Sequence, residues 1–359
     1  MNVLIVGSGL TGAVFANRLK YIANVTVIDK RYHTGGNIYL DIEEGIKLHK
    51  YGAHIFHTNN EIVWDYINRY DSNSFVHYIH RVKAINDGKY YTLPFNLDTL
   101  DEMRMSKFIE QVEGKEYANL EEYCINTVGW EIYDKLIRDY TTKQWGIEPK
   151  YLPASIIKRI PIRNDRDDRY FTDKYQGLFD YNVIINNLLK GVEVKLNTDF
   201  FDYTNEDKSK YDHIIYTGAI DKLCDYRYGI LGWRCLKFDN EVIGVDKYQS
   251  LPVINYTSNK EYYTRIIEHK NFPHYHYNLP YTLISKEYTE PYSIDKTPDY
   301  PINTETDRKM YIEYREWVKE NLTNYTLCGR LADYVYIDMH QAISKAITKS
   351  DDLYNRLSK

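Results

Sequence analysis

The first 29 residues contain a strand, a glycine turn, a helix and a second strand that ends in an acid. The apolar segment 3–6 leads into Gly7–Gly12 (GSGLTG), a helical pattern follows through Leu19, and the apolar segment 25–28 ends at Asp29. A glycine pattern in this context is typical of a dinucleotide-binding βαβ unit. The sequence therefore predicts an α/β fold that begins with a Rossmann-like domain.

Each glycine of the turn has a separate physical reason to be glycine. Gly7 permits the tight turn, Gly9 lets the backbone approach a pyrophosphate, and Gly12 lets the helix pack closely on the strand. The first N–H groups of the helix then face the phosphates, and Asp29 accepts hydrogen bonds from a ribose. A chance glycine cluster is the alternative, but the agreement of strand, helix and acid favours the dinucleotide.

Composition excludes several classes of protein. The 359 residues are long enough for two or three domains with a sizeable core, and the net charge of −5 argues against a nucleic-acid partner. No uncharged apolar run approaches the roughly 18 residues of a membrane span.

The four cysteines are scattered without a CxxC, so we expect neither a metal site nor a disulfide framework. Reduced cysteines and the absence of an export signal predict a cytoplasmic location.

The remaining pattern predicts that the nucleotide-binding domain is interrupted and later resumed. We expect strands in 75–85 and 89–93, helices from 97 to 147, and a buried strand in 211–218 that rejoins the nucleotide-binding sheet. Strands of a separate antiparallel sheet are expected in 249–256, 262–268 and 281–288, and a final helix from Met339 to about Leu357.

These elements predict three domains. The dinucleotide-binding domain comprises 1–75 with 176–223 and 321–359, the helical domain is 97–152, and an antiparallel sheet domain for the substrate comprises 76–96 with 153–175 and 224–320.

Arginines supply the clearest candidates for binding an anionic substrate. Arg159 lies in a proline-containing segment, and Arg265 lies in a predicted strand. The planar guanidinium group can meet two phosphate oxygens at once. An ordinary ion pair with a neighbouring carboxylate explains either arginine equally well from composition alone.

Longer motifs carry a resemblance to a known family. After the first turn come 35–37 (GGN), 49–58 (HKYGAHIFHT), 140–146 (YTTKQWG), 158–163 (KRIPIR), 263–268 (YTRIIE), 300–303 (YPIN) and the segment 329–341. With these motifs in this order, the chain resembles the bacterial FAD-dependent UDP-galactopyranose mutases over nearly its whole length. The Gly35-Gly36 pair also favours FAD over NAD.

The resemblance implies a reaction without net redox change. In this family, reduced flavin acts as a nucleophile through N5 at the anomeric carbon, and UDP-galactopyranose and UDP-galactofuranose interconvert. The product supplies galactofuranose for cell-surface polysaccharide. The resemblance also implies a homodimer and a cellular reductant, either NAD(P)H or a reductase.

The resemblance assigns roles residue by residue. Arg159 and Arg265 become the diphosphate clamps, and His54 lies next to the isoalloxazine. The expected FAD-binding residues are Gly7, Gly9, Leu10, Thr11, Gly12, Asp29, Lys30, Gly36, Asn37, His54, Val194, Arg330, Asp338 and Met339. The expected substrate-binding residues are Asn96, Tyr140, Trp145, Arg159, Tyr170, Arg265, Tyr300 and Tyr336.

Three alternatives remain open. Leu331-Ala332-Asp333 replaces a glycine-containing version common in the family, so the same reaction on UDP-N-acetylgalactosamine is one. A flavin amine oxidase or related oxidoreductase on the same FAD scaffold is another. The third is a nucleotide-sensing binding module that turns over nothing.

Overall fold

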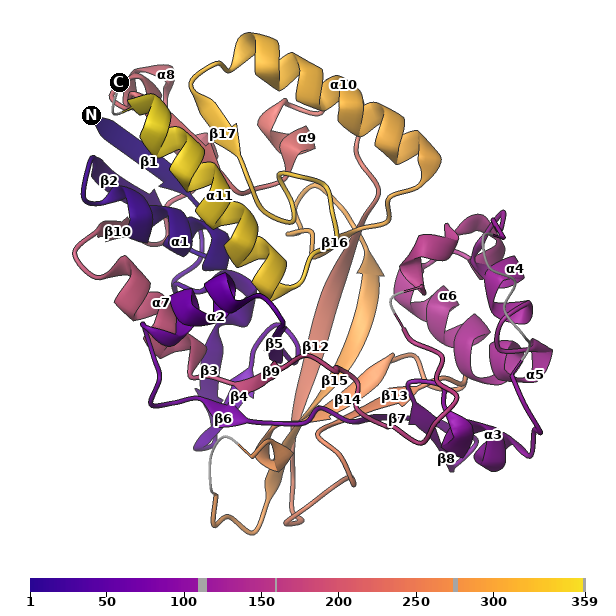
Figure 1. The fold of residues 1–359 in the computed structure, drawn as a ribbon. Helices are drawn as coiled ribbons and strands as arrows, with labels where there is room; N and C mark the ends of the chain where they lie inside the picture. Colours follow the sequence, from indigo (N-terminus) through magenta and orange to yellow (C-terminus); the bar gives the residue numbers. More distant parts are fainter. Residues whose placement is uncertain (109–114, 159, 274–276, 358–359) are drawn as a thin grey trace.

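The computed structural model describes residues 1–108, 115–158, 160–273 and 277–357. A parallel sheet with its helices forms one part of the molecule, and a larger sheet extends from it toward a group of short helices (Figure 1). No helix among the described residues is both long enough and apolar enough to cross a membrane.

The five-stranded parallel sheet contains the N-terminal strand. Its order is β10-β2-β1-β11-β17, and each neighbouring pair is parallel. The strands are β1 (Asn2–Val6), β2 (Asn24–Ile28), β10 (Glu193–Lys195), β11 (His213–Tyr216) and β17 (Tyr325–Leu327). The predicted strand within 211–218 is thus confirmed as a later strand of the nucleotide-binding sheet.

The glycine turn connects β1 to α1 (Leu10–Leu19) through a very close backbone contact. Gly7 has φ +102, which strongly favours glycine, and a Cβ atom on Gly12 would lie 1.9 Å from the Gly7 carbonyl oxygen. No side chain caps the helix at Gly9. The helix therefore begins directly against the strand, with its first turn open to a ligand.

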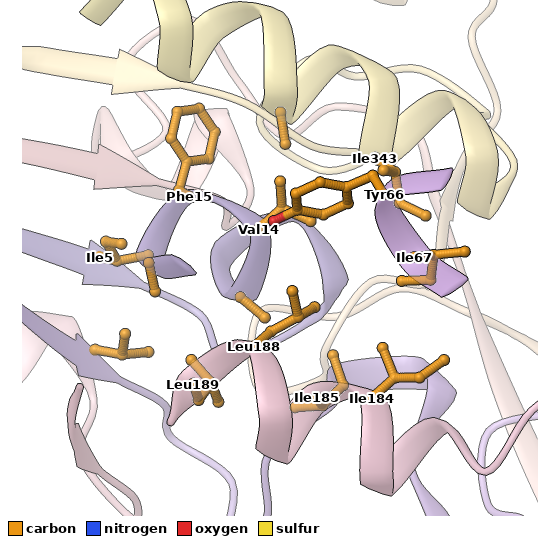
Figure 2. Packing of buried hydrophobic residues seen from close by; sticks show 14 of the residues in the cluster. Ile5, Val14, Phe15, Tyr66, Ile67, Ile184, Ile185, Leu188, Leu189 and Ile343 are labelled. Atoms are coloured by element: carbon orange, nitrogen blue, oxygen red, sulfur yellow. The ribbon is translucent and has the colours of Figure 1, made fainter. Parts of the chain in front are cut away.

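One face of this sheet is covered by four helices. These are α1, α2 (Glu61–Asn68), α7 (Tyr181–Leu189) and α11 (Met339–Leu357). Their side chains gather in one apolar cluster, to which Val14, Leu188 and Ile343 belong (Figure 2). The final helix begins at Met339, as the sequence predicted.

The opposite face packs against α9 (Ile220–Leu223) and α10 (Glu305–Asn321). Tyr314 and Val318 of α10 share a buried cluster with Leu4 of β1 and Ile214 of β11. The three-domain division stays a proposal, and this packing favours starting the last segment of the dinucleotide-binding domain near residue 305 rather than at 321.

The second large sheet has seven strands in the order β16-β12-β15-β14-β13-β7-β8. They are β7 (Val82–Asn86), β8 (Lys89–Leu93), β12 (Trp233–Ile243), β13 (Val253–Tyr256), β14 (Arg265–Glu268), β15 (Thr282–Pro291) and β16 (Tyr300–Pro301). The predicted antiparallel sheet is confirmed for every neighbouring pair of these strands except β13 and β7, which pair in parallel. These two strands come from distant parts of the chain, so no tight turn fixes their relative direction.

Smaller strands join the two parts. β5 (Phe56–Thr58), β6 (Val76–His77) and β9 (Tyr175–Leu178) form a three-stranded sheet, and β3 (Leu40–Glu43) pairs with β4 (Ile46–His49). The predicted strand over 75–85 is therefore wrong as a single element. Its first residues pair with β9 and its last residues pair with β8 and β13.

Short helices follow β8, as the sequence predicted for 97–147. They are α3 (Leu97–Met103), α4 (Leu120–Ile125), α5 (Trp130–Ile132), the π-helical turn η2 (Tyr133–Arg138) and α6 (Asp139–Trp145). Brief 3₁₀ turns and one short helix complete the chain, namely η1 (Gly36–Ile38), η3 (Pro149–Tyr151), η4 (Ala154–Ile156), η5 (Phe200–Asp202), α8 (Asn205–Ser209) and η6 (His269–Asn271). Figure 1 shows α4, α5 and α6 far from the parallel sheet.

The contact between Gly12 and Gly7 gives a test of the turn. We expect Gly12→Ala to lower the free energy of unfolding by at least about 2 kcal/mol and to reduce bound flavin, because a methyl group cannot fit against the Gly7 carbonyl. Gly244→Ala is the matched control, since nothing lies within 4 Å of a Cβ there. Urea unfolding and the flavin-to-protein absorbance ratio measure both effects. Equal stability of the two variants would contradict the packing account.

Candidate active site

A single cavity of about 700 Å³ extends from the glycine turn to the short helices. One end is lined by Gly9 and Thr11, the middle by Arg265, and the other end by Leu136 and Trp145. The cavity therefore touches the parallel sheet, the mixed sheet and the helical segment. A cofactor and a substrate could therefore both bind in it.

Two helix N-termini face the first end of the cavity. Leu10 and Thr11 begin α1, and Asp338 and Met339 stand at the start of α11; all four line the cavity. Helix N-termini carry free N–H groups and a partial positive charge, which favour a pyrophosphate or an electron-rich ring. The same end includes Arg330.

The backbone at this end fits a dinucleotide such as FAD. Gly329 has φ +112, and a Cβ atom there would lie 3.4 Å from the Thr11 hydroxyl. Gly36 is also left-handed, and its Cβ would lie 3.0 Å from the Gly9 Cα. Side chains at these positions would crowd the turn that a dinucleotide pyrophosphate approaches.

Five of the predicted cofactor residues do not line the cavity, namely Gly7, Asp29, Lys30, Gly36 and Val194. Asp29 stabilises the turn itself, because one of its oxygens accepts the Ser8 N–H at 2.8 Å and the Ser8 hydroxyl at 2.7 Å. Its contact with a ribose stays a prediction. Val194 lies in β10 beside Val27, and the Lys30 amine donates to the Thr297 hydroxyl at 2.7 Å.

Arg31 lies in the cavity wall and was missed by sequence reasoning. Its guanidinium group donates to the Asn37 side-chain oxygen at 2.9 Å and lies 4.3 Å from the Tyr51 ring centroid. Asn37 in turn donates to Asp299 at 3.2 Å. This network holds a positive charge beside the glycine turn, where a phosphate would bind.

His54 lies between the cofactor end and the centre of the cavity. Its Nδ1 lies 2.8 Å from the Gly52 carbonyl oxygen, which requires the proton on Nδ1 and leaves Nε2 as an acceptor. Burial lowers the pKa of His54 to about 4, and the charge of Arg330 acts in the same direction. The ring is therefore neutral at pH 7.

Arg265 occupies the centre of the cavity on β14. Its guanidinium group donates to the Tyr140 hydroxyl at 2.9 Å, and its Nε lies 3.2 Å from a carboxylate oxygen of Glu287. Although burial alone disfavours the charged form, Glu287 raises the pKa of Arg265 above its usual value. A fixed positive charge in a confined site is suited to binding an anion.

Tyrosines and one tryptophan surround this charge. Tyr140, Trp145, Tyr170 and Tyr336 line the cavity. Tyr300 lies behind the wall, where it packs edge-on against Trp145 at 5.2 Å and donates to the Gln144 carbonyl at 3.1 Å. The structure thus brings four of the predicted aromatic residues to the cavity and places the fifth in support of Trp145.

Asn96 and Arg159 are the two remaining residues predicted to bind the substrate. Asn96 is fully buried, caps α3 through the Thr99 N–H at 3.1 Å, and does not line the cavity. The expected contact of Asn96 with the substrate is therefore not supported by its position. Arg159 lies outside the described residues, while Lys158 and Ile160 line the cavity.

A cluster of histidines and carboxylates beside the flavin end was not anticipated. His57 lies 2.9 Å from Asp173 through Nδ1 and 3.7 Å from Asp338 through Nε2, and its ring stacks on Phe171. Together with His340, the potential ligand atoms of His57 and Asp338 lie within 4.8 Å of one another. The three groups could hold a metal ion, although exposed acidic groups commonly occur without one.

Comparison with known proteins gives one consistent result. The family model described as UDP-galactopyranose mutase matches residues 135–336, and a model described as an NAD(P)-binding Rossmann-like domain matches residues 5–70. A Klebsiella pneumoniae protein described as "Probable UDP-galactopyranose mutase" is 35% identical, covering 99% of this chain and 96% of that protein. The dTDP-fucopyranose mutase of Escherichia coli is 36% identical, with 96% of each chain covered.

Solved structures agree on the fold. A crystal structure of reduced UDP-galactopyranose mutase superposes with a TM-score of 0.77 at 14% identity, covering 100% of this chain and 94% of the other. A putrescine oxidase double mutant superposes with a TM-score of 0.58 at 12% identity, covering 99% of each chain. Because oxidases share this architecture, the fold alone does not separate a mutase from an oxidase.

The position of Arg265 predicts a selective loss of turnover. We expect Arg265→Lys to lower kcat/KM by at least about a hundredfold. An ammonium group cannot replace both the planar pair of guanidinium donors and the hydrogen bond to Tyr140. Flavin content should stay normal, since Arg265 lies away from the glycine turn. Lys286→Ala, on the neighbouring strand β15, is the control and should retain activity. Steady-state kinetics near those of the control would remove Arg265 from the site.

The environment of His54 predicts its protonation state. We expect the ring to stay neutral from pH 8 to 5 and to take up a second proton only near pH 4. The pKa of His54 in the folded protein lies below its value of about 6.5 in the unfolded chain. Lowering the pH from 6.5 toward 4 therefore reduces the contribution of His54 to the free energy of unfolding, by up to about 1.4 kcal/mol per pH unit. Histidine NMR checks the assignment, and a midpoint near 6.5 would contradict it.

Proposed function

Because the chain belongs to the UDP-galactopyranose mutase family, we propose that it interconverts UDP-galactopyranose and UDP-galactofuranose with bound reduced FAD. The single observation that carries this proposal is the continuous cavity from the glycine turn to Trp145, with Arg265 at its centre. A nucleotide sugar has the matching order of parts, with the diphosphate between the sugar and the base.

The charges in the cavity favour an anionic substrate over an amine. Arg265 and Arg330 both line it, and Glu287, the carboxylate beside Arg265, is 3% exposed. Asp173 and Asp338 also line the cavity, but so do Arg31, Lys158 and Arg163, and this excess of cations attracts a diphosphate more than a cationic amine. This electrostatic arrangement argues for a mutase and against an amine oxidase on the shared scaffold.

The chain's own residues have separable tasks in this reaction. Arg265 would hold the diphosphate while its bond to the sugar is broken and remade, so that the leaving group stays in place. Tyr170 and Tyr336, whose side chains line the same cavity, would donate neutral hydrogen bonds to phosphate oxygens. Trp145, 7% exposed, offers an aromatic face to a pyrimidine base.

The cofactor would supply the nucleophile. FAD, when bound and reduced, provides an electron-rich nitrogen able to attack the anomeric carbon, with no net oxidation. The residues of this chain would hold its pyrophosphate at the start of α1 and its ring near α11. Neutral His54 would lie beside the ring with an unprotonated nitrogen. We further propose that NAD(P)H or a reductase keeps the cofactor reduced and that the enzyme is a homodimer.

A second substrate is supported by a specific observation. The E. coli relative named dTDP-fucopyranose mutase is as similar to this chain as the K. pneumoniae relative. Aliphatic residues line the base end of the cavity, among them Leu136, Ile137 and Ile157. They would accommodate the methyl group that distinguishes thymine from uracil. Leu331 also lines the cavity, so the N-acetylated sugar remains a third substrate to compare.

A comparison of three nucleotide sugars as substrates tests the proposal. Dithionite-reduced protein is incubated separately with UDP-galactofuranose, dTDP-fucopyranose and UDP-N-acetylgalactosamine, and the products are resolved by chromatography. We expect UDP-galactofuranose to be converted with a kcat/KM at least about tenfold above that of the other two. A preference for dTDP-fucopyranose would replace the substrate and keep the reaction class. No conversion of any of the three would contradict the proposed function.

A further inference from the structure

Lys143 of α6 makes an unusual set of contacts in the wall behind the cavity. Its ammonium group donates to the carbonyl oxygens of Tyr256 and Ser258 at 2.7 Å, of Glu261 at 2.9 Å and of Tyr263 at 3.0 Å. The carbonyls come from the end of β13 and the loop that leads to β14. We call these four oxygens the carbonyl cage.

The carbonyl cage has the chemistry of a monovalent-cation site. Main-chain carbonyl oxygens that converge on one point replace the hydration shell of ions such as potassium. An ammonium group has only three protons for four acceptors, so it binds here as a compact charge as well as a donor. Without a cation, four carbonyl dipoles would repel one another.

The lysine lies between two cavity residues on the same short helix. Tyr140 precedes Lys143 by three residues, so the two side chains lie on the same face of the helix. Trp145 follows Lys143 by two residues. Tyr140 accepts a hydrogen bond from Arg265 at 2.9 Å, and Arg265 directly follows the loop that forms the carbonyl cage. The cage and the Tyr140 contact therefore dock α6 on one hairpin at two points.

The far end of α6 is anchored by different residues. The Gln144 carbonyl accepts from Arg234 Nε at 3.2 Å and from the Tyr300 hydroxyl at 3.1 Å. Arg234 leaves no space for a side chain at Gly146, where a Cβ would lie 2.6 Å from its guanidinium nitrogen. The backbone end of α6 is thus held by β12 and β16, while the carbonyl cage and the hydrogen bond between Arg265 and Tyr140 hold its side toward β13 and β14.

Resting on the proposed function, we propose that Lys143 is a positioning residue for substrate binding. Its ammonium group fills a cation site of four main-chain carbonyls and sets the distance between Trp145, which would meet the base, and Arg265, which would meet the diphosphate. Loss of the cation lets α6 move on the hairpin, so that base and diphosphate can no longer engage their partners together.

Chemical rescue provides the test. Lys143→Ala removes the ammonium group and leaves the carbonyl cage empty, whereas Lys143→Met keeps the apolar stem and blocks the cage without a charge. Lys260→Ala is the matched control, because Lys260 belongs to the same loop but is exposed and pairs only with Asp87 among the contacts described for its amine. UDP is titrated calorimetrically into each FAD-loaded protein.

We expect Lys143→Ala and Lys143→Met each to raise the Kd for UDP by about tenfold, while Lys260→Ala stays within about twofold of wild type. Ammonium chloride at about 100 mM should restore most of the affinity of Lys143→Ala, because the ion has the charge, size and donors of the missing group. Sodium chloride and tetramethylammonium chloride at the same concentration should not, and Lys143→Met should respond to none of the salts.

Two outcomes would overturn the inference. One is a Kd for Lys143→Ala within about twofold of wild type, and the other is equal recovery in sodium chloride, which would reflect ionic strength alone. Failure of wild type to bind UDP or dTDP would count against the proposed function instead. Hydrogen exchange then decides on the carbonyl cage: ammonium-dependent protection of α6 in Lys143→Ala supports it, and unchanged exchange refutes it.

Discussion

The contact between Gly12 and the Gly7 carbonyl is the constraint on which the cofactor end depends. Because no Cβ fits there, α1 starts directly on β1 and its first turn stays open. Asp29 reinforces the turn through both the backbone and the side chain of Ser8. From this fixed point the parallel sheet positions β11 and β17, and β17 leads to Gly329, Arg330 and the start of α11.

The mixed sheet then carries the site away from the cofactor. Arg265 and Glu287 are direct partners in the antiparallel pairing of β14 and β15, so the register of two strands fixes the charge at the centre of the cavity. Tyr140 reaches the same arginine from α6. A buried cation with a carboxylate partner is held in place but retains donors for a ligand, which is the property that a diphosphate site needs.

The sequence predicted the elements whose signals are local. The first βαβ unit, the strand that contains Ile214 and the helix beginning at Met339 are confirmed, because each combines an apolar pattern with a glycine turn or a clear boundary. β12 was missed, since its residues 239–242 are partly or fully exposed and show no alternation. The parallel pairing of β7 with β13 depends on contacts between distant segments, which periodicity cannot reveal. The roles of Glu287 and Lys143 were missed for the same reason. The partner of Glu287 is set by the register of two strands, and the partners of Lys143 are main-chain carbonyls of a distant segment.

We propose that this chain uses a flavin scaffold for an isomerisation without net redox change. The most direct measurement compares oxidised and dithionite-reduced protein, both loaded with FAD under anaerobic conditions, for conversion of UDP-galactofuranose. We expect turnover by the reduced protein only, with the flavin spectrum still reduced after many turnovers. Equal turnover by the oxidised protein, or stoichiometric oxidation of the flavin with each product formed, would contradict it.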